Sequence, residues 1–399
     1  MSKNASKPPL EASVRDLNHI LGAERVIPAD SGDTYTLYPR STADVAAIVK
    51  WAKRHQVVVG CCPRGAVTEG GPDVFLVWDG MNRLLEVDVY SNLVQAQAGI
   101  SLRQLESELN QAGYTTGYVP GGADRTLAYH LAMRSVQYGG PQYGGLDQLV
   151  VSLEAVLPAG TVIRTPQAPR RATGIDPRAL LLGTGGHFGI VCSATMRVFP
   201  RFAQVQDLAF YYSSDSLACE ALRLLLRHEI SPTRVAIVAG QRGTQLGLEG
   251  FPARGAVLLL SIGLGVPGSD DQPRRASKRL TDLGDALTEV DVAGWWSAVL
   301  DQHPDDGLEL SLHWDGIEPL FGSLPSGLVD TAVVTHCGKH GAVIVLGGGD
   351  DGERAAAVAA TEAQNGGWRD LRRASVISPR DQQLRAILDT EGVIDAGEA

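Results

Sequence analysis

The sequence predicts an α+β protein with two main parts. Before Pro200, short strands and helices follow one another with mostly local connections. After Pro200 the predicted order becomes strand, helix, strand, strand, helix and strand. This order is typical of a ferredoxin-like layer whose helices cover one face of an antiparallel sheet. We therefore expect a mixed N-terminal domain followed by a ferredoxin-like α/β cap domain.

The N-terminal part opens with a helix that leads into a sheet. Apolar residues recur at helical spacing from Val45 to Ala52, behind a cap formed by Ser41 and Thr42. The run Val57–Val59 follows and is typical of a buried strand. Three further strands are predicted over residues 74–78, 84–89 and 93–98, separated by turn residues.

A second helix and a hairpin complete this part. Ser101 and Gln104 form a capping-box pattern at the start of the helix, and Gly113 provides a stop signal at its end. A hairpin turn at Pro158-Ala159-Gly160 joins two of the remaining strands. These strands are predicted over residues 150–157, 161–165 and 190–199, the last of them ending at Pro200.

The second part is predicted to alternate strands and helices. Its predicted strands cover residues 208–212, 235–239 and 257–260, and its first predicted helix covers 217–228. The polar stretch 267–275 is interpreted as a loop. Near the C-terminus, residues 384–394 are predicted to form a short helix that ends at a glycine turn.

Composition excludes several classes of function. A chain of 399 residues with 44% hydrophobic and 20% charged content is typical of a soluble globular protein of two or three domains. The formal net charge of −10 argues against nucleic acid or an anionic membrane as a partner. The longest apolar run, 256–266, is far shorter than the roughly 20 residues of a membrane span.

The N-terminus and the cysteines indicate a cytoplasmic protein. Met1–Pro9 has no basic segment followed by an apolar one, so we expect no secretion signal. The five cysteines form neither a CxxC pair nor a zinc-binding spacing, and their odd number favours a reducing compartment. They are Cys61, Cys62, Cys192, Cys219 and Cys337.

Glycine-rich turns recur in a fixed order before Pro200. They are Pro63-Arg64-Gly65, Pro120-Gly121-Gly122, Tyr143-Gly144-Gly145 and Gly183-Thr184-Gly185-Gly186. Consecutive backbone N–H groups in such turns can form an anion-binding nest, and glycine permits close approach of the backbone to a ligand. This order resembles the FAD-binding PCMH-type domain of the vanillyl-alcohol-oxidase superfamily. The resemblance implies a two-subdomain FAD-binding domain over residues 37–200, after an N-terminal extension and lead-in helix over 1–36.

The resemblance also implies FAD as the cofactor and a set of residues that would hold it. Those residues are Pro63, Arg64, Gly65, Ala66, Val67, Thr68, Pro120, Gly121, Gly122, Thr126, Tyr143, Gly183, Thr184, Gly185, Gly186 and Ile190. Three loops depart from the family pattern. Ala66 and Val67 replace two glycines of the phosphate turn. Tyr129 replaces a glycine of the second loop, and His187 stands where a small hydroxyl residue is usual in the third.

The cap contains part of a family motif. Two-hydroxy-acid dehydrogenases of this superfamily hold a metal through a His-x-Gly-Asp-Gly-Asn-x-His segment and a later Glu-His-Gly. Here His336 keeps the first ligand position, Val343 takes the second, and the Glu-His-Gly is absent. The close spacing of His336, Cys337 and His340 is more typical of a turn between strands, so we expect no metal.

The order of segments is most like that of the accessory FAD-binding subunit of glycolate oxidase complexes. The N-terminal half is also similar to alkyldihydroxyacetonephosphate synthases. The resemblance implies a cap or substrate domain over residues 201–378 and a C-terminal segment, 379–399, that returns to the FAD domain. The partners that it implies are a small-molecule substrate and, within a complex, a larger flavoprotein subunit and an iron–sulfur subunit.

We predict an FAD-linked oxidoreductase. In such an enzyme, hydride passes from the hydroxyl-bearing carbon of a 2-hydroxy acid or alcohol to the flavin while a base takes the hydroxyl proton. Tyr118, His187 and His336 are the candidate catalytic residues. One alternative is a structural or interaction subunit whose cofactor site has decayed. Another is a non-redox flavoenzyme similar to alkyldihydroxyacetonephosphate synthase.

Overall fold

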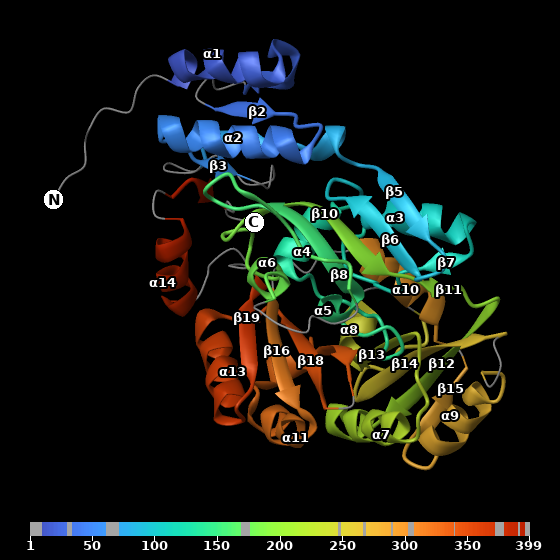
Figure 1. Cartoon of the computed structure of the whole chain (residues 1–399). Helices are drawn as coiled ribbons and strands as arrows, with labels where there is room; N and C mark the ends of the chain where they lie inside the picture. The colour runs from blue at the N-terminus through green and yellow to red at the C-terminus, as the bar shows by residue number, and fades with distance from the viewer. Residues whose placement is uncertain are drawn as a thin grey trace.

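The computed structural model shows three sheets stacked along the molecule. It describes residues 10–29, 34–60, 72–168, 176–245, 249–265, 269–288, 290–301, 307–338, 340–371, 379–389 and 392–395. Figure 1 shows a small N-terminal sheet with two helices at the top, a second sheet in the middle, and a large sheet at the bottom. The first two sheets form the N-terminal domain, and the large sheet forms the cap.

A small mixed sheet forms the first subdomain, with its strands in the order β1-β2-β4-β3-β20. Their bounds are β1 Val26–Pro28, β2 Tyr35–Leu37, β3 Val59–Gly60, β4 Val74–Leu76 and β20 Ile394–Asp395. Helices α1 (Leu10–Leu21) and α2 (Thr42–His55) pack on each other. A hydrogen bond joins them, in which Trp51 Nε1–H donates to the Ser13 carbonyl at 2.9 Å. β20 pairs in parallel with β3, so the end of the chain completes a sheet built by its beginning.

An antiparallel sheet in the order β5-β6-β10-β8-β9 forms the second subdomain. Its strands are β5 Leu84–Asp88, β6 Leu93–Gln97, β8 Val150–Val156, β9 Val162–Arg164 and β10 Ile190–Arg197. Four helices accompany it, α3 Leu102–Gln111, α4 Leu127–Met133, α5 Leu146–Leu149 and α6 Arg178–Leu181. A two-stranded sheet pairs β7 (Tyr114–Thr115) with β11 (Phe199–Pro200).

The predicted helix starts and hairpin of this domain are confirmed. The Ser41 side chain accepts from the Asp44 N–H at 3.1 Å, and the Ser101 side chain accepts from the Gln104 N–H at 3.1 Å. Each serine therefore caps its helix. The β8–β9 hairpin turns at Gly160, whose φ of 73° is the left-handed conformation that favours glycine.

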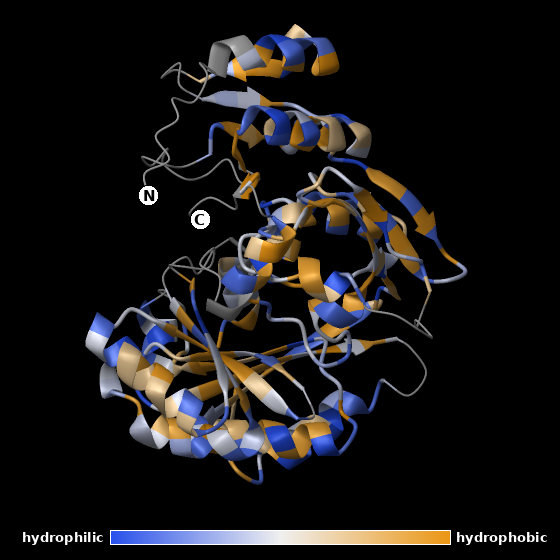
Figure 2. Ribbon diagram, turned by 60° about the vertical axis from the view of Figure 1, so that its left-hand side comes forward, coloured by the Kyte–Doolittle hydropathy of each residue, from blue (hydrophilic) through white to orange (hydrophobic). Residues whose placement is uncertain are grey.

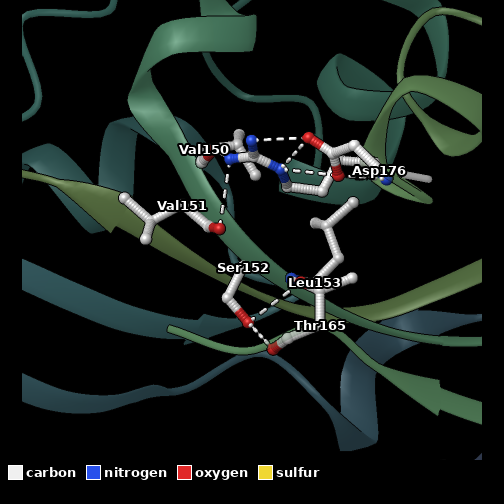
Figure 3. A network of polar contacts seen from close by, with 7 residues as sticks. Val150, Val151, Ser152, Leu153, Thr165 and Asp176 are labelled. Atoms are coloured by element: carbon white, nitrogen blue, oxygen red, sulfur yellow. Dashed lines mark hydrogen bonds and ion pairs between the residues drawn. The ribbon is translucent and has the colours of Figure 1, made fainter. Parts of the chain in front are cut away.

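A polar network holds Thr165, which follows β9, and the start of α6 against β8 (Figure 3). Arg178 donates to the carbonyls of Val150 and Val151 at 2.5 and 3.1 Å and forms an ion pair with Asp176 at 2.7 Å. Thr165 accepts at its carbonyl from the Ser152 hydroxyl at 2.6 Å. These contacts position the start of α6 and hence the glycine turn that follows it.

The cap is one eight-stranded antiparallel sheet in the order β15-β12-β14-β13-β17-β18-β16-β19. Its strands are β12 Gln204–Tyr212, β13 Arg234–Ala239, β14 Ala256–Leu264, β15 Asp285–Leu287, β16 Gly307–His313, β17 Val333–Cys337, β18 Gly341–Gly347 and β19 Gly367–Asp370. Each half has the strand order of a ferredoxin-like unit, and the two halves join where β13 pairs with β17. The predicted ferredoxin-like layer is confirmed. A second ferredoxin-like unit lies beside it, although the sequence shows no repeat that predicts it.

Helices cover the outer face of the cap sheet (Figure 1), and hydrophobic residues line its strands (Figure 2). The covering helices are α7 Asp215–Arg227, α9 Gln272–Leu280, α11 Trp314–Ser323 and α13 Asp351–Ala363. The remaining helices are α8 Gly240–Gln245, α10 Val292–Asp301, α12 Ser326–Val329 and α14 Pro379–Leu388. No helix among the described residues is long and apolar enough to cross a membrane.

One predicted loop is wrong. The polar stretch 267–275 becomes helical from Gln272, where α9 begins. Pro273 lies in the first turn, where a missing N–H costs nothing and the fixed φ suits a helix. Ala276 and Leu280 then pack into the core under the sheet, so tertiary burial stabilises a helix whose sequence is otherwise polar.

Backbone pairing joins the cap to the N-terminal domain through the segment 136–140. On one side, Tyr138 N–H donates to the Val119 carbonyl at 2.8 Å. On the other side, Gly140 N–H donates to the Thr233 carbonyl at 2.8 Å, and Val235 N–H donates to the Tyr138 carbonyl at 3.3 Å. This joining segment is therefore a strand-like link between the two domains.

Arg369 is a second link between the domains. From β19 of the cap, its guanidinium donates to the carbonyls of Met133 and Arg134 at the C-terminal end of α4. The same guanidinium forms an ion pair with Glu309 at 2.6 Å. A cation at a helix C-terminus satisfies carbonyls that have no partner within the helix and interacts favourably with the helix dipole.

We expect Arg369→Met to lower the free energy of unfolding by about 2–3 kcal/mol, because it leaves the half-buried Glu309 unpaired. Arg164→Met is the matched control, since Arg164 pairs with Glu154 at 2.7 Å but is 73% exposed. That change should cost much less than Arg369→Met, because water screens an exposed ion pair. Urea unfolding of both variants checks this, and equal losses would contradict the role of Arg369.

Asp215, the first residue of α7, is buried in an unfavourable environment for its charge. It is 8% exposed, and its Oδ1 has no hydrogen-bond partner among the described residues. Burial, with a smaller effect from Asp330, raises the pKa of Asp215 from 3.8 to about 7. The folded state therefore binds this proton more tightly than the unfolded chain does. The stability that protonated Asp215 contributes is fully present below pH 3.8 and is lost as the pH rises through about 7.

We expect Asp215→Asn to stabilise the protein by about 1–3 kcal/mol at pH 8 and to have little effect at pH 4. Asp351→Asn is the control, because Asp351 is also the first residue of a cap helix but is exposed. Unfolding in urea at the two pH values measures the difference. A gain for Asp215→Asn that does not depend on pH would contradict the burial argument.

Candidate functional site

A glycine turn between α6 and β10 forms one wall of the candidate site. Gly183, Gly185 and Gly186 have φ values of 75°, 63° and 83°. These left-handed conformations favour glycine. The amides of Gly183 and Gly185 donate to the carbonyls of Leu131 and Ala132, both at 2.9 Å. The turn is thus held against α4.

The turn leaves open space beside its backbone at Gly186. Gly186 is buried, yet a Cβ built on it would meet no heavy atom within 4 Å. A buried glycine beside open space lets a ligand lie directly against the backbone. Thr184 and Ile190 support the turn from either side, because the Thr184 hydroxyl donates to the Leu180 carbonyl at 3.1 Å and Ile190 is buried in the core. These residues fit a flavin nucleotide.

The turn Pro120-Gly121-Gly122 forms a second wall. All three residues are buried, and Gly122 has a φ of 66°. Gly121 N–H donates to the Val136 carbonyl at 3.3 Å, which ties the turn to the joining segment. Thr126 then caps α4, accepting from the Tyr129 N–H at 3.2 Å. The glycine turn before β10 and the turn Pro120-Gly121-Gly122 therefore both adjoin α4, the first through Leu131 and Ala132 and the second through Thr126.

Tyr129, which replaces a family glycine, lies within α4. The Arg125 guanidinium is 4.4 Å from the centroid of its ring, and the edge of the His130 ring contacts it at a centroid distance of 5.6 Å. A helix accommodates the large side chain here. The phosphate turn Pro63, Arg64, Gly65, Ala66, Val67 and Thr68 lies outside the described residues.

The two predicted tyrosines are buried. Tyr118 is 2% exposed, its hydroxyl donates to the Ser135 carbonyl at 3.1 Å, and burial raises its pKa far above the usual value. Tyr143 lies against Gly117, where a Cβ would come within 2.2 Å of the ring. Burial raises the pKa of Tyr143 to about 12. Both phenols are protonated at neutral pH, so they can donate hydrogen bonds.

The two predicted histidines come from different domains. His187 lies on the turn before β10 and is 4% exposed. His336 lies on β17 of the cap, and its Nδ1 contacts Gln137 Nε2 at 3.1 Å and the Gly139 carbonyl at 3.4 Å. Burial lowers the pKa of His336 below its usual value. At neutral pH its imidazole is therefore uncharged.

A cavity of about 630 Å³ opens beside His336. It is lined by the β17–β18 hairpin of the cap and by the segment of the N-terminal domain that contains Gly144. His336 Nε2 would lie 3.6 Å from a Cβ built on Gly145, so this nitrogen faces the glycine segment. The structure thus brings His336 to Gly144 and Gly145, nearly 200 positions away in the sequence.

The predicted turn between strands is confirmed, because β17 ends at Cys337 and β18 begins at Gly341. Both Cys337 and His340 line the cavity, but Cys337 belongs to the cap core and is 0% exposed, whereas His340 is exposed. Among the described residues, no group of three or more histidine, cysteine, aspartate and glutamate side chains could hold a metal ion.

Gln137 is a site residue that no motif marks. Its side-chain amide contacts both His336 and the Gly144 carbonyl, the latter at 3.4 Å. Its Oε1 is buried with no hydrogen-bond partner among the described residues. A lone glutamine carries no spacing pattern, so only the folded chain reveals that it orients the imidazole.

Comparison with known proteins identifies an FAD binding domain and several relatives of this chain. Residues 34–166 match a family model described as FAD binding domain. The uncharacterized FAD-linked oxidoreductase YgcU of Escherichia coli (strain K12) is 29% identical over 270 residues, which cover 59% of this chain and 55% of that protein. The mitochondrial D-lactate dehydrogenase [cytochrome] of Kluyveromyces lactis is 27% identical over 196 residues, covering 46% and 34%. The matched part therefore spans about half the length of YgcU and about a third of the length of the D-lactate dehydrogenase.

A solved structure extends the likeness to the cap. The structure of an alkyldihydroxyacetonephosphate synthase superposes with a TM-score of 0.73 at 17% identity, covering 96% of this chain and 85% of that one. This likeness shows that the fold is shared over both domains. The glycine turns, the matched region and the shared fold lead to one conclusion: residues 34–166 contain an FAD-binding domain similar to that of FAD-linked oxidoreductases of the vanillyl-alcohol-oxidase superfamily, and the cofactor is FAD.

Proposed function

We propose that this protein oxidises the hydroxyl-bearing carbon of a small 2-hydroxy acid or alcohol. When bound, FAD supplies the hydride acceptor. The observation that carries the proposal is the position of His336, an uncharged imidazole that faces Gly145 and lines a cavity between the two domains. The D-lactate dehydrogenase relative supports a hydroxy acid as the substrate class.

His336 is the proton acceptor in this proposal. The Gly139 carbonyl can only accept, so its contact with Nδ1 requires an Nδ1–H. Turning the Gln137 amide places Oε1, otherwise buried without a described partner, on the same Nδ1–H, and it gives up the 3.4 Å contact of Nε2 with the Gly144 carbonyl. In that state the His336 Nε2, beside Gly145, carries the lone pair and can take the hydroxyl proton of the substrate.

Tyr118 and Tyr143 have a different role in the proposed reaction. Because burial keeps both phenols protonated, neither removes a proton at neutral pH. Tyr118 fixes the Ser135 carbonyl, and Tyr143 packs against Gly117 and Phe199, so both shape the wall of the site. The direct role of His187 stays a prediction, as does a complex with a larger flavoprotein subunit and an iron–sulfur subunit.

A second candidate function is a non-redox flavoenzyme reaction. The shared fold with an alkyldihydroxyacetonephosphate synthase over both domains favours it. The two functions differ in one observable, because only the oxidoreductase bleaches its flavin absorbance when substrate is added without an electron acceptor.

We expect purified protein to show flavin absorbance near ~450 nm and to lose it under anaerobic conditions with D-lactate, glycolate or a related alcohol. His336→Asn should keep the flavin but reduce the rate of bleaching about 10²-fold or more, since it removes the proton acceptor. His313→Asn is the control, because His313 lines the same cavity from an exposed position.

The pH dependence provides a further check on the same reaction. Because burial lowers the pKa of His336 from 6.5, kcat/KM should fall in acid with a midpoint below pH 6.5. A flavin that no substrate of this class bleaches would exclude the oxidase reaction. Equal rates for wild type and His336→Asn would exclude His336 as the base.

We expect Gly186→Ala to weaken FAD binding about tenfold or more, because its Cβ projects into the open space beside the turn. Gly348→Ala is the control: its φ of 68° is equally left-handed and its Cβ also meets nothing, but it lies in an exposed loop. Both variants should lose about 1 kcal/mol of stability in the absence of FAD. FAD titration of the apoprotein separates the two effects, and equal affinities would rule out Gly186 as a cofactor contact.

A further inference from the structure

A groove lies at the junction of the two domains, away from the cavity that His336 lines. It consists of two adjoining cavities of about 550 and 420 Å³. We call it the junction groove and define it by the residues that line both cavities, Glu106, Asn110, Thr115, Val119, Arg201 and Arg234. Neither His336 nor the glycine turn before β10 lines it, but it borders the candidate site, because Tyr118 and Pro120 line one of its cavities and Tyr143 lines the other.

Arg234 brings a positive charge into the groove from the cap. It is the first residue of β13, and its guanidinium lies 5.8 Å from the centroid of the Trp296 ring. Burial is the main influence on this group and lowers its pKa. Its side chain makes no hydrogen bond or ion pair with another described residue. Arg234 is half-buried, and a half-buried charge without such a partner favours a counter-ion, so an anion in the groove would stabilise it.

Arg201 brings a second positive charge from the segment that connects the domains. Its backbone is fixed, because its N–H donates to the Gly113 carbonyl at 2.9 Å. Its side chain is exposed and forms no ion pair with a described residue, although it lines both cavities. The groove therefore has one arginine from the cap sheet and one from the segment that connects the domains.

The two carboxylates near the groove are occupied by other donors. Glu106 accepts from the Thr115 hydroxyl at 2.8 Å, and from the backbone N–H of Thr116 at 2.9 Å and its hydroxyl. Asp207 accepts from the Ser261 hydroxyl at 2.5 Å. Both acids act on Arg234 only through space, as does the Tyr143 phenol. These hydrogen bonds hold the acids in place and leave the guanidinium donors for another partner.

We propose that the junction groove binds a small anionic metabolite whose carboxylate or phosphate group lies between Arg201 and Arg234. Guanidinium groups bind planar and tetrahedral oxyanions through paired, charge-assisted hydrogen bonds. Each cavity also lies within the range of about 300–1,000 Å³ found for small-molecule sites. Because the arginines come from the cap and from the connection between the domains, such a ligand joins the two domains.

Calorimetric titration of the full-length, FAD-loaded protein tests this site, with inorganic phosphate and succinate as separate probes. At least one probe should bind saturably. Arg234→Met and Arg201→Met should each weaken that binding about tenfold or more, since each removes a charge-assisted pair. Saturation by phosphate alone identifies a phosphate-bearing ligand, and saturation by succinate alone identifies a carboxylate-bearing ligand.

Arg103→Met is the matched control. Arg103 also lines the groove, but Asp124 holds its guanidinium through an ion pair at 2.6 Å, so the change should leave the affinity nearly unaltered. Arg201 is exposed, so Arg201→Met should keep the melting temperature of wild type and report on binding alone. Absence of saturable binding of both probes overturns the proposal. Equal affinity of wild type, Arg201→Met and Arg234→Met overturns it as well.

Discussion

Backbone hydrogen bonding along residues 136–140 is the constraint on which the rest of the structure depends. This joining segment pairs with the loop that carries Pro120 and Gly121 on one side and with the start of β13 on the other. Gly140 has no room for a side chain, because a Cβ would lie 2.0 Å from the Pro232 carbonyl oxygen. The flavin-side loops and the cap sheet are therefore fixed to one piece of backbone.

This arrangement explains how distant residues form one site. Gln137 and Gly139 lie on the joining segment and contact His336 from the cap. Arg369 adds a charged contact from β19 to the end of α4, the helix that also supports the glycine turn before β10. Because the same elements carry both the domain contacts and the site, docking of the cap and assembly of the site are one event.

Burial decides the charge of the groups at this junction. The imidazole of His336 is uncharged and the phenols of Tyr118 and Tyr143 keep their protons, because an apolar environment disfavours each charged form. Arg234 is subject to the same burial but belongs to a residue type that stays protonated. The junction therefore contains an uncharged candidate base and, in the junction groove, a charge that favours an anion.

Local signals in the sequence determined much of this fold. Ser41 and Ser101 predict helix starts because a side-chain cap depends only on residues three positions apart. The order of the glycine turns predicted the superfamily. The helix from Gln272 escaped prediction, because its stability comes from burying Ala276 and Leu280 against the cap sheet. Tertiary structure alone decided that Gln137 holds His336 and that Arg201 and Arg234 share a groove, since each contact joins residues with no common local pattern.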